Sequence, residues 1–284
     1  MKTQKVWFIT GASKGFGLEI AKSALEAGDK VVATVRSKPE QLAETLNNNP
    51  DLLITIMDVS NEAQVKASAA EAIEKFGQID VLVNNAGYGL LSGVEEATDA
   101  EVRKQYDTNV FGLLNVTRAI LPQMRKQRSG HVINVSSVFG FGSMGGWGLY
   151  GSTKFAVEGI TEALALEVAP LGIKVTAVEP GLFSTDFLDT NSLFQSANAI
   201  DDYKDTVGAM RSGVIGLHGN QPGDPAKLGQ AFIKLVNAKN PPVHLPLGTD
   251  TVAFYRAKTD KLEQEIKDWE AVTNSTNHDA VATA

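Results

Sequence analysis

The sequence predicts an α/β domain built on a doubly wound parallel sheet. Short apolar runs rich in β-branched residues recur along the chain, and helical patterns separate one run from the next. Such runs are typical of strands buried on both faces of a parallel sheet, and their alternation with helices defines the doubly wound class. The strand runs are 5–10, 30–35, 52–57, 80–84, 131–136 and 174–179, and the helical patterns are 16–27, 38–47, 61–76, 99–127 and 150–171.

Local signals mark the ends of two of these helices. Asp99 is expected to be the N-cap of the helix over 99–127, because its carboxylate can accept a hydrogen bond from a free backbone N–H group. The "PLG" stretch at 170–172 is expected to end the helix over 150–171.

The last third of the chain is less regular. Residues 184–222 are rich in Ser, Asn, Asp and Gly, which predicts a loop that contributes to the substrate pocket. A helix over 223–236, capped by Asp224, a short strand at 243–247 and an amphipathic helix around 251–270 follow, and Trp269 is expected to pack. We therefore expect one catalytic domain over 1–272 and a polar, disordered tail over 273–284.

Composition excludes several classes of function. The formal charge of -7 argues against a protein that binds the phosphate backbone of nucleic acids. No apolar run is long enough to span a membrane, and no signal peptide precedes the first strand. There are no cysteines, and the four histidines show no metal-ligand spacing. We expect a cytoplasmic protein that binds neither membrane, nucleic acid nor metal.

The stretch "TGASKGFG" at 10–17 joins the first strand to the first helix. Glycines at 11, 15 and 17 allow a tight turn and let a diphosphate approach the backbone N–H groups of the helix N-terminus. An ordinary glycine-rich turn is the alternative, but the position directly after the first buried strand favours a dinucleotide site.

The end of the second strand bears on the choice of cofactor. Sites that prefer NAD place a carboxylate there for the adenosine ribose, whereas this chain has Val35 and then Arg36. Lys14 lies in the glycine loop near the same place. Two cations without an acid favour the 2′-phosphate of NADP(H) over a solvated basic pair.

In "YGSTK", Tyr150 and Lys154 share one face of a helix, one turn apart. The ammonium group is expected to favour the phenolate and so to lower the pKa of the phenol toward neutrality. A phenol of that kind can exchange a proton with a carbonyl or alcohol oxygen. Taken alone, the pair would also fit a chance arrangement on a surface helix.

Together these motifs resemble the short-chain dehydrogenase/reductase family. The resemblance runs from Lys5 to Thr185 and includes, in order, "TGASKGFG", "MDV" at 57–59, "NNAG" at 84–87, "NVFG" at 109–112, "NVSS" at 134–137, "YGSTK" and "PGLFST" at 180–185. It implies a Rossmann fold with a sheet of about seven strands, a nicotinamide cofactor and a homodimer or homotetramer. It also implies a catalytic tetrad of Asn109, Ser137, Tyr150 and Lys154, in which Asn109 supports Lys154 through water.

The expected cofactor contacts come from the glycine loop, the strand ends and the catalytic pair. Asp58 is expected either to bind the adenine amino group or to stabilise a turn, and Thr185 either to bind the nicotinamide carboxamide or to cap a helix. The cofactor set is Gly11, Ser13, Lys14, Gly15, Phe16, Gly17, Arg36, Asp58, Val59, Asn85, Ala86, Gly87, Tyr150, Lys154, Pro180, Gly181, Phe183 and Thr185.

The substrate pocket is expected to be apolar, and its set is Ser137, Phe139, Met144, Trp147, Tyr150 and Phe187. No cation lies between 138 and 149, so a hydrophobic ketone, aldehyde or secondary alcohol fits better than an anion. Sugars, steroids, aryl ketones and fatty acyl derivatives remain open. The predicted protein is an NADP(H)-dependent oxidoreductase that interconverts a carbonyl and an alcohol. A non-catalytic, NADP-binding redox sensor and a structural partner are the alternatives.

Overall fold

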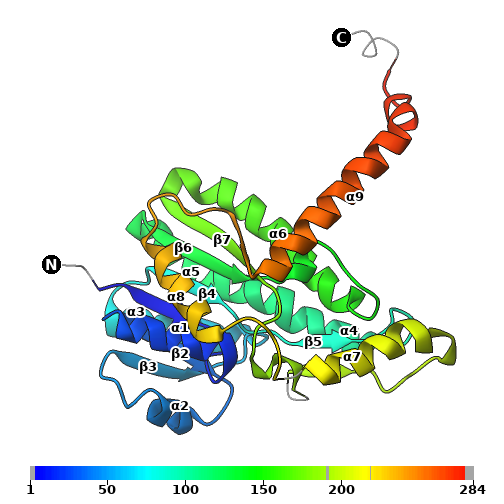
Figure 1. Ribbon diagram of the computed structural model, residues 1–284. Coiled ribbons are helices and arrows are strands. Elements are labelled where there is room, and N and C mark those ends of the chain that lie inside the picture. Colours follow the sequence, from blue (N-terminus) through cyan, green and yellow to red (C-terminus); the bar gives the residue numbers. More distant parts are fainter. Residues whose placement is uncertain (1–3, 190–191, 218, 279–284) are drawn as a thin grey trace.

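The computed structural model describes residues 4–189, 192–217 and 219–278 (Figure 1). Its main sheet has seven parallel strands in the order β3-β2-β1-β4-β6-β7-β9, so the predicted fold class is confirmed. The six predicted strand runs and the short run at 243–247 are these seven strands. Their bounds are β1 Val6–Ile9, β2 Lys30–Val35, β3 Leu52–Ile56, β4 Val81–Asn84, β6 Gly130–Val135, β7 Ile173–Pro180 and β9 His244–Leu247.

Helices cover both faces of this sheet, and each face has its own hydrophobic core. On one face, Ile20 and Phe232 are fully buried between the strands and helices α1 Gly15–Glu26, α2 Pro39–Thr45 and α8 Pro225–Asn237. On the other face, Ile120 and Met124 are fully buried in the core that the strands form with helices α3 Glu62–Phe76, α5 Leu113–Gln127 and α6 Gly148–Val168. The core residues of the strands come from consecutive positions, as a sheet buried on both faces requires.

The predicted helix over 99–127 is divided into three parts. These are α4 Asp99–Tyr106, the π-helical segment η1 Asp107–Gly112 and α5. The expected cap was wrong by one residue. Thr98 is the N-cap, because its hydroxyl accepts a hydrogen bond from the backbone of Glu101 while the Glu101 carboxylate accepts one from the backbone of Thr98. Asp99 lies inside the first turn and pairs with Arg103.

The other predicted helix ends are confirmed. After α6 the chain continues as η3 Ala169–Leu171 and stops at Gly172, whose φ of 74° lies in the left-handed region that glycine adopts readily. Asp224 is the N-cap of α8 and accepts a hydrogen bond from the backbone N–H of Ala226.

The segment over 184–222 has more regular structure than the sequence predicts. It contains η4 Asp186–Leu188, β8 Leu193–Gln195, η5 Asp201–Tyr203, η6 Lys204–Gly208 and α7 Ala209–Leu217. Strand β8 pairs in parallel with β5 Gly89–Leu91, a second small sheet that no sequence pattern indicated. Glu96 connects this segment to the body, since it accepts hydrogen bonds from the Ile200 backbone and lies 2.8 Å from Arg211.

The C-terminal helix α9 Thr249–Asn274 extends well away from the rest of the molecule (Figure 1). The predicted tail overlaps its end, because Thr273 and Asn274 are helical, while 279–284 fall outside the described residues. Packing of Trp269 was also expected, but this side chain is 64% exposed. In the described part of the chain, no helix is both long and apolar enough to cross a membrane.

Candidate active site

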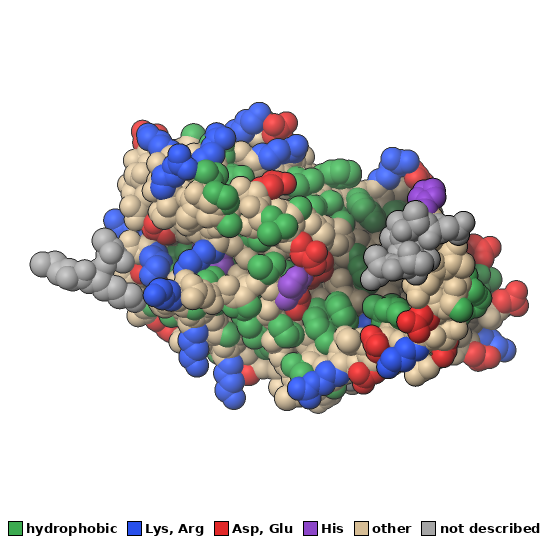
Figure 2. All heavy atoms as spheres, turned by 90° about the horizontal axis from the view of Figure 1, so that it is seen from above, with side chains coloured by type: hydrophobic (Ala, Val, Ile, Leu, Met, Phe, Trp, Pro, Cys, Tyr) green, Lys and Arg blue, Asp and Glu red, His purple; other side chains and the backbone are tan. Residues whose placement is uncertain are grey.

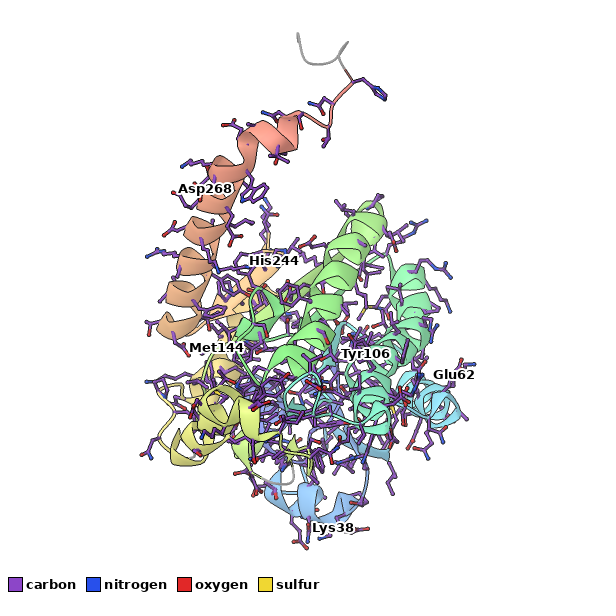
Figure 3. All side chains as sticks on the ribbon, turned by 90° about the vertical axis from the view of Figure 1, so that its right-hand side faces the viewer. Lys38, Glu62, Tyr106, Met144, His244 and Asp268 are labelled. Atoms are coloured by element: carbon purple, nitrogen blue, oxygen red, sulfur yellow. The ribbon has the colours of Figure 1, made fainter. Side chains whose placement is uncertain are left out.

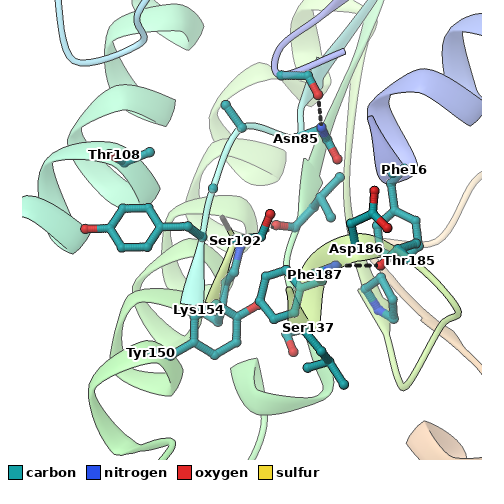
Figure 4. Close-up of a pocket in the computed structure, with 18 of the residues that line it drawn as sticks. Phe16, Asn85, Thr108, Ser137, Tyr150, Lys154, Thr185, Asp186, Phe187 and Ser192 are labelled. Atoms are coloured by element: carbon teal, nitrogen blue, oxygen red, sulfur yellow. Dashed lines mark hydrogen bonds between the residues drawn. The ribbon is translucent and has the colours of Figure 1, made fainter. Parts of the chain in front are cut away.

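A cavity of about 1030 Å³ lies where the strands of the main sheet reach their carboxyl ends (Figure 4). Its walls come from the segments that follow β1, β2, β3, β4, β6 and β7, together with α6 and α7. This edge of a doubly wound sheet is where ligands bind. Every predicted cofactor residue except Gly17, and all six predicted substrate residues, line the cavity.

The glycine loop forms a cradle at one end of the cavity. Gly11 and Gly15 have φ angles of 65° and 56°, which L side chains rarely adopt. Gly17 is buried instead of lining the cavity, and a Cβ atom there would come within 2.7 Å of Asn85 Nδ2. That amide donates hydrogen bonds to the carbonyls of Thr10 and Gly11, at 2.9 and 3.0 Å. Among the described residues no side chain caps the N-terminus of α1, so its first N–H groups can bind an anion.

Lys14 and Arg36 lie beside this cradle. Within the described residues neither side chain has a hydrogen bond or an ion pair, so both cations are free to bind an anion. Asp58 is close by, but its carboxylate accepts hydrogen bonds from the Ser60 backbone at 2.9 Å and the Ser60 hydroxyl at 2.6 Å. Burial raises the pKa of Asp58, but these hydrogen bonds and the charge of Arg36 outweigh it and hold the pKa below its ordinary value. The turn role expected for Asp58 is therefore present.

Tyr150 and Lys154 project from α6 into the centre of the cavity (Figure 4). Both are buried, and Lys154 Nζ lies 5.6 Å from the centroid of the tyrosine ring. The ammonium group donates a hydrogen bond of 2.9 Å to the carbonyl of Val135, which fixes it beside the end of β6. Ser137 follows two residues later and lines the same part of the cavity. The structure thus brings Ser137, Tyr150 and Lys154 together.

The protonation of this pair differs from the sequence prediction. Burial raises the pKa of the Tyr150 phenol above its ordinary value, although a hydrogen bond with Ser137 opposes the shift. Burial lowers the pKa of Lys154 to about 8, and the charge of Glu158 opposes that shift. Among the protein's own groups, desolvation thus outweighs the expected effect of the ammonium group on the phenol. At neutral pH Tyr150 carries its proton.

Asn109 lies in the π-helical segment η1, close to Gly87. Its amide nitrogen donates to the Tyr88 carbonyl at 3.0 Å and to the Thr153 hydroxyl at 3.1 Å, and its oxygen accepts from the Tyr88 backbone. A Cβ atom at Gly87 would lie 3.1 Å from Asn109 Oδ1 and 3.8 Å from Lys154 Nζ. Asn109 is therefore near Lys154 without a direct hydrogen bond to it, and a π-bulge of this kind often marks a functional site.

Aromatic side chains form the other end of the cavity. Phe139 stacks on Trp147 at 5.1 Å between ring centroids, and the Phe187 ring lies 5.7 Å from that of Tyr150 (Figure 4). Phe187 belongs to η4, whose N-cap is Thr185, so the capping role expected for Thr185 is present. Helix α7 adds Met210 and Val214, which the sequence pattern did not reveal because 184–222 lacks an apolar period.

The structure also assembles a charged cluster that residue spacing did not reveal. His244 Nδ1, at the start of β9, lies 2.9 Å from the Glu179 carboxylate and 3.2 Å from the Glu158 carboxylate. Glu158 lies on α6, one helical turn after Lys154. Burial raises the pKa of Glu158 to about 7, while Glu179 and Glu158 raise that of His244 despite the burial of the ring. The three side chains are close enough to hold a cation. However, His244 Nδ1 already lies at hydrogen-bond distance from the Glu179 carboxylate, and this contact needs no metal.

The sequence of this chain is similar to those of known oxidoreductases. The family model for short chain dehydrogenases matches residues 5–195, and the chain belongs to that family. It is 38% identical over 267 residues to Oxidoreductase BOA17 of Botryotinia fuckeliana, covering 93% of this chain and 96% of that one. It is 40% identical over 245 residues to 3-ketodihydrosphingosine reductase of Bacteroides thetaiotaomicron, covering 86% and 88%.

Solved structures support the same family assignment. A short-chain dehydrogenase from Streptomyces avermitilis matches with a TM-score of 0.90 and 40% identity, covering 98% of this chain and all of that one. The structure of ElxO with NADP bound matches with a TM-score of 0.74 and 28% identity, covering 88% of this chain and all of ElxO. The protein is thus an oxidoreductase of the short-chain dehydrogenase family with a nicotinamide cofactor.

Proposed function

We propose that this protein is an NADP(H)-dependent reductase of hydrophobic ketones or aldehydes. The observation that carries the proposal is that Ser137, Tyr150 and Lys154 meet in the cavity between the glycine loop and an aromatic wall. These are the groups that proton transfer to a carbonyl oxygen requires, and a protein that only sensed NADP would need none of them.

The residues around the cavity fit a dinucleotide. The positive φ angles of Gly11 and Gly15 and the uncapped N-terminus of α1 offer backbone N–H groups to a diphosphate. The free cations of Lys14 and Arg36 would hold a 2′-phosphate, which favours NADP(H) over NAD(H). Lys154 would hold the nicotinamide ribose hydroxyls, and Thr185 the carboxamide. When bound, the nicotinamide supplies the hydride.

The protein's own groups supply the proton and the orientation. Tyr150, protonated at neutral pH, would donate its proton to the substrate oxygen as that oxygen gains negative charge. Ser137 would donate a hydrogen bond to the same oxygen and so fix the carbonyl next to the phenol. Lys154 would stabilise the phenolate that remains, and Asn109 would keep Lys154 in place through a bridging water.

The substrate class follows from the wall of the cavity. Phe139, Trp147 and Phe187 present carbon surface, and Met144 at the rim is half exposed. The relative named 3-ketodihydrosphingosine reductase supports a ketone on a long hydrophobic molecule as substrate. Sugars lack the apolar surface that such a wall would bury.

The test is a substrate panel with NADPH, followed by the loss of cofactor absorbance. Ketones of the form R–CO–CH₃ with chains of increasing length should show kcat/KM rising with length, because each buried CH₂ group contributes about 0.8 kcal/mol, or roughly threefold to fourfold. Pyruvate, a short anionic ketone, is the control and should be a poor substrate. A kcat/KM that does not change with chain length would contradict the proposed hydrophobic substrate class. A failure to reduce any carbonyl in the panel would contradict the proposed reductase activity.

A further inference from the structure

The outer part of α9 is a helix without a partner in its own chain. Only Thr251 of this helix is buried, and every residue from Thr259 to Asn274 is exposed. The base of the helix is attached to the body, where Phe254 lies 6.4 Å from Phe139 and Tyr255 lies 4.3 Å from Phe141, between ring centroids. Figure 3 shows the consequence, with Asp268 far out on a helix that has left the rest of the fold.

This free part of the helix is not polar all round. Leu262, Ile266, Trp269 and Val272 are 47%, 51%, 64% and 55% exposed. Leu262, Ile266 and Trp269 belong to an exposed series that also includes Thr259 and Thr273, with spacings of three and four residues in turn. That spacing is the heptad seam by which one helix packs against another. A helix of this length with no tertiary contacts is only marginally stable in water, so the seam indicates a partner.

The charges along α9 identify the kind of partner. Within α9, residues 256–262 have three cations and one acid, whereas residues 263–274 have four acids and one lysine. An identical helix running in the opposite direction would place the basic half of each copy beside the acidic half of the other. In that arrangement Arg256 faces Glu270 of the partner subunit.

The sizes of the seam residues favour the same direction. In an antiparallel pair Ile266 packs beside Leu262 of the partner subunit, and Trp269 packs beside Thr259 of the partner subunit. Each of these layers therefore has a volume that the helices can accommodate, with Trp269 opposite a threonine. A parallel pair would place Trp269 against itself and leave threonine opposite threonine.

The acids next to the middle of the seam do not prevent this pairing. Glu263 and Glu265 would each meet their counterpart in the other copy, but each is already paired within its own helix. Glu265 lies 3.7 Å from Lys261, and Glu263 lies 3.5 Å from Lys267. Figure 2 shows this face of the molecule, where acidic and basic side chains lie near one another on its right-hand side.

We propose that two copies of this chain associate through an antiparallel pair of α9 helices, with Leu262, Ile266 and Trp269 in the seam. Because the base of α9 packs on Phe139 and Phe141, the pairing would also hold in place the segment that follows Ser137. The proposal concerns a surface outside the cavity and is independent of the proposed reductase activity.

Disulfide trapping in the full-length chain tests the proposal, and the absence of native cysteines makes the result unambiguous. Leu262→Cys and Ile266→Cys are made separately, one with a larger affinity tag, then mixed at equal concentration and oxidised mildly. Antiparallel pairing predicts that the mixed disulfide forms at least tenfold faster than either self-disulfide. Gln264→Cys, on the outer face of the helix, is the matched control for random collision. Thermal unfolding of each variant checks that the chain is folded.

Three results would overturn the proposal. Self-disulfides in excess of the mixed product would mean that the helices pair in parallel. Mixed product at the rate of the Gln264→Cys control would mean that α9 does not pair. A blue shift of Trp269 fluorescence on vesicles of phosphatidylserine, absent from Trp269→Phe, would mean that the stripe binds lipid instead.

Discussion

The substitution Glu158→Gln should flatten the dependence of stability on pH. Glu158 is almost wholly buried, with Glu179 and His244 as its neighbours (Figure 3 labels His244). Glutamine keeps the size of the side chain and cannot ionise. The substitution therefore removes one titration from the cluster while leaving its packing in place.

The size of the effect follows from the raised pKa. In the folded protein the pKa of Glu158 is about 7, against 4.5 in an unfolded chain. The folded state therefore holds this proton more tightly, and the stability it contributes is present below pH 4.5 and lost as the pH rises through 7. At 1.36 kcal/mol per pKa unit, about 2 kcal/mol of that contribution is lost between pH 5.5 and 8.5. The raised pKa of His244 acts in the same direction.

The assay is thermal unfolding of both proteins at pH 5.5 and at pH 8.5. The native protein should lose roughly 4–8 °C more in Tm across this range than Glu158→Gln loses. The comparison is needed because His131, whose pKa burial lowers to about 4, has the opposite pH dependence and is present in both proteins. Glu162→Gln, at an exposed carboxylate 3.4 Å from His244, is the matched control and should change the slope far less. Parallel Tm curves for the native protein and Glu158→Gln would refute the argument.

Other measurements address the cavity. Tyr150→Phe should lower turnover by about 10² or more while NADPH still binds. Lys154→Met should weaken both turnover and NADPH binding. Near-native ketone reduction by Tyr150→Phe would contradict the role of Tyr150 as proton donor. Arg36→Ala should weaken NADPH binding by roughly tenfold to a hundredfold with little effect on NADH, and equal losses measured by fluorescence titration would give the arginine another role. Phe187→Ala should raise kcat/KM for bulky ketones, because this ring lies against Tyr150, and an unchanged value would mean that it does not restrict access. Backbone amides of 192–214 should exchange with D₂O faster than those of the central strands, and equal protection would mean that this part of the pocket wall is as rigid as the sheet.

Much of the fold could be predicted because its signals are local. Strands β1, β2 and β4 consist largely of consecutive buried apolar residues, and such runs are typical of strands buried on both faces of a sheet. The cofactor loop was also evident, since glycines at fixed places after a first strand have a physical reason. Each of these features lies within one short stretch of the chain.

The features that the sequence did not reveal depend on contacts between distant segments. Strands β5 and β8 have three residues each and exist because they pair, although about a hundred positions separate them. Glu158, Glu179 and His244 come from α6, β7 and β9, so no spacing along the chain brings them together. The exposure of Trp269 was missed for a related reason. A heptad seam predicts packing, but it does not tell whether the partner lies in the same chain.

The burial of Tyr150 has a consequence for the direction of the reaction. The sequence alone suggested that Lys154 would draw the phenol toward ionisation, yet desolvation has the larger effect and leaves the phenol protonated. A protonated phenol beside Ser137 is ready to act as an acid, as carbonyl reduction requires, whereas alcohol oxidation would first require the loss of that proton from a buried site. Lys154, with a pKa of about 8, still carries its charge on most molecules at neutral pH and can stabilise the phenolate once the proton has moved. The protein's own electrostatics therefore favour reduction, and oxidation would depend on raising the pH or on the positive charge of the oxidised nicotinamide.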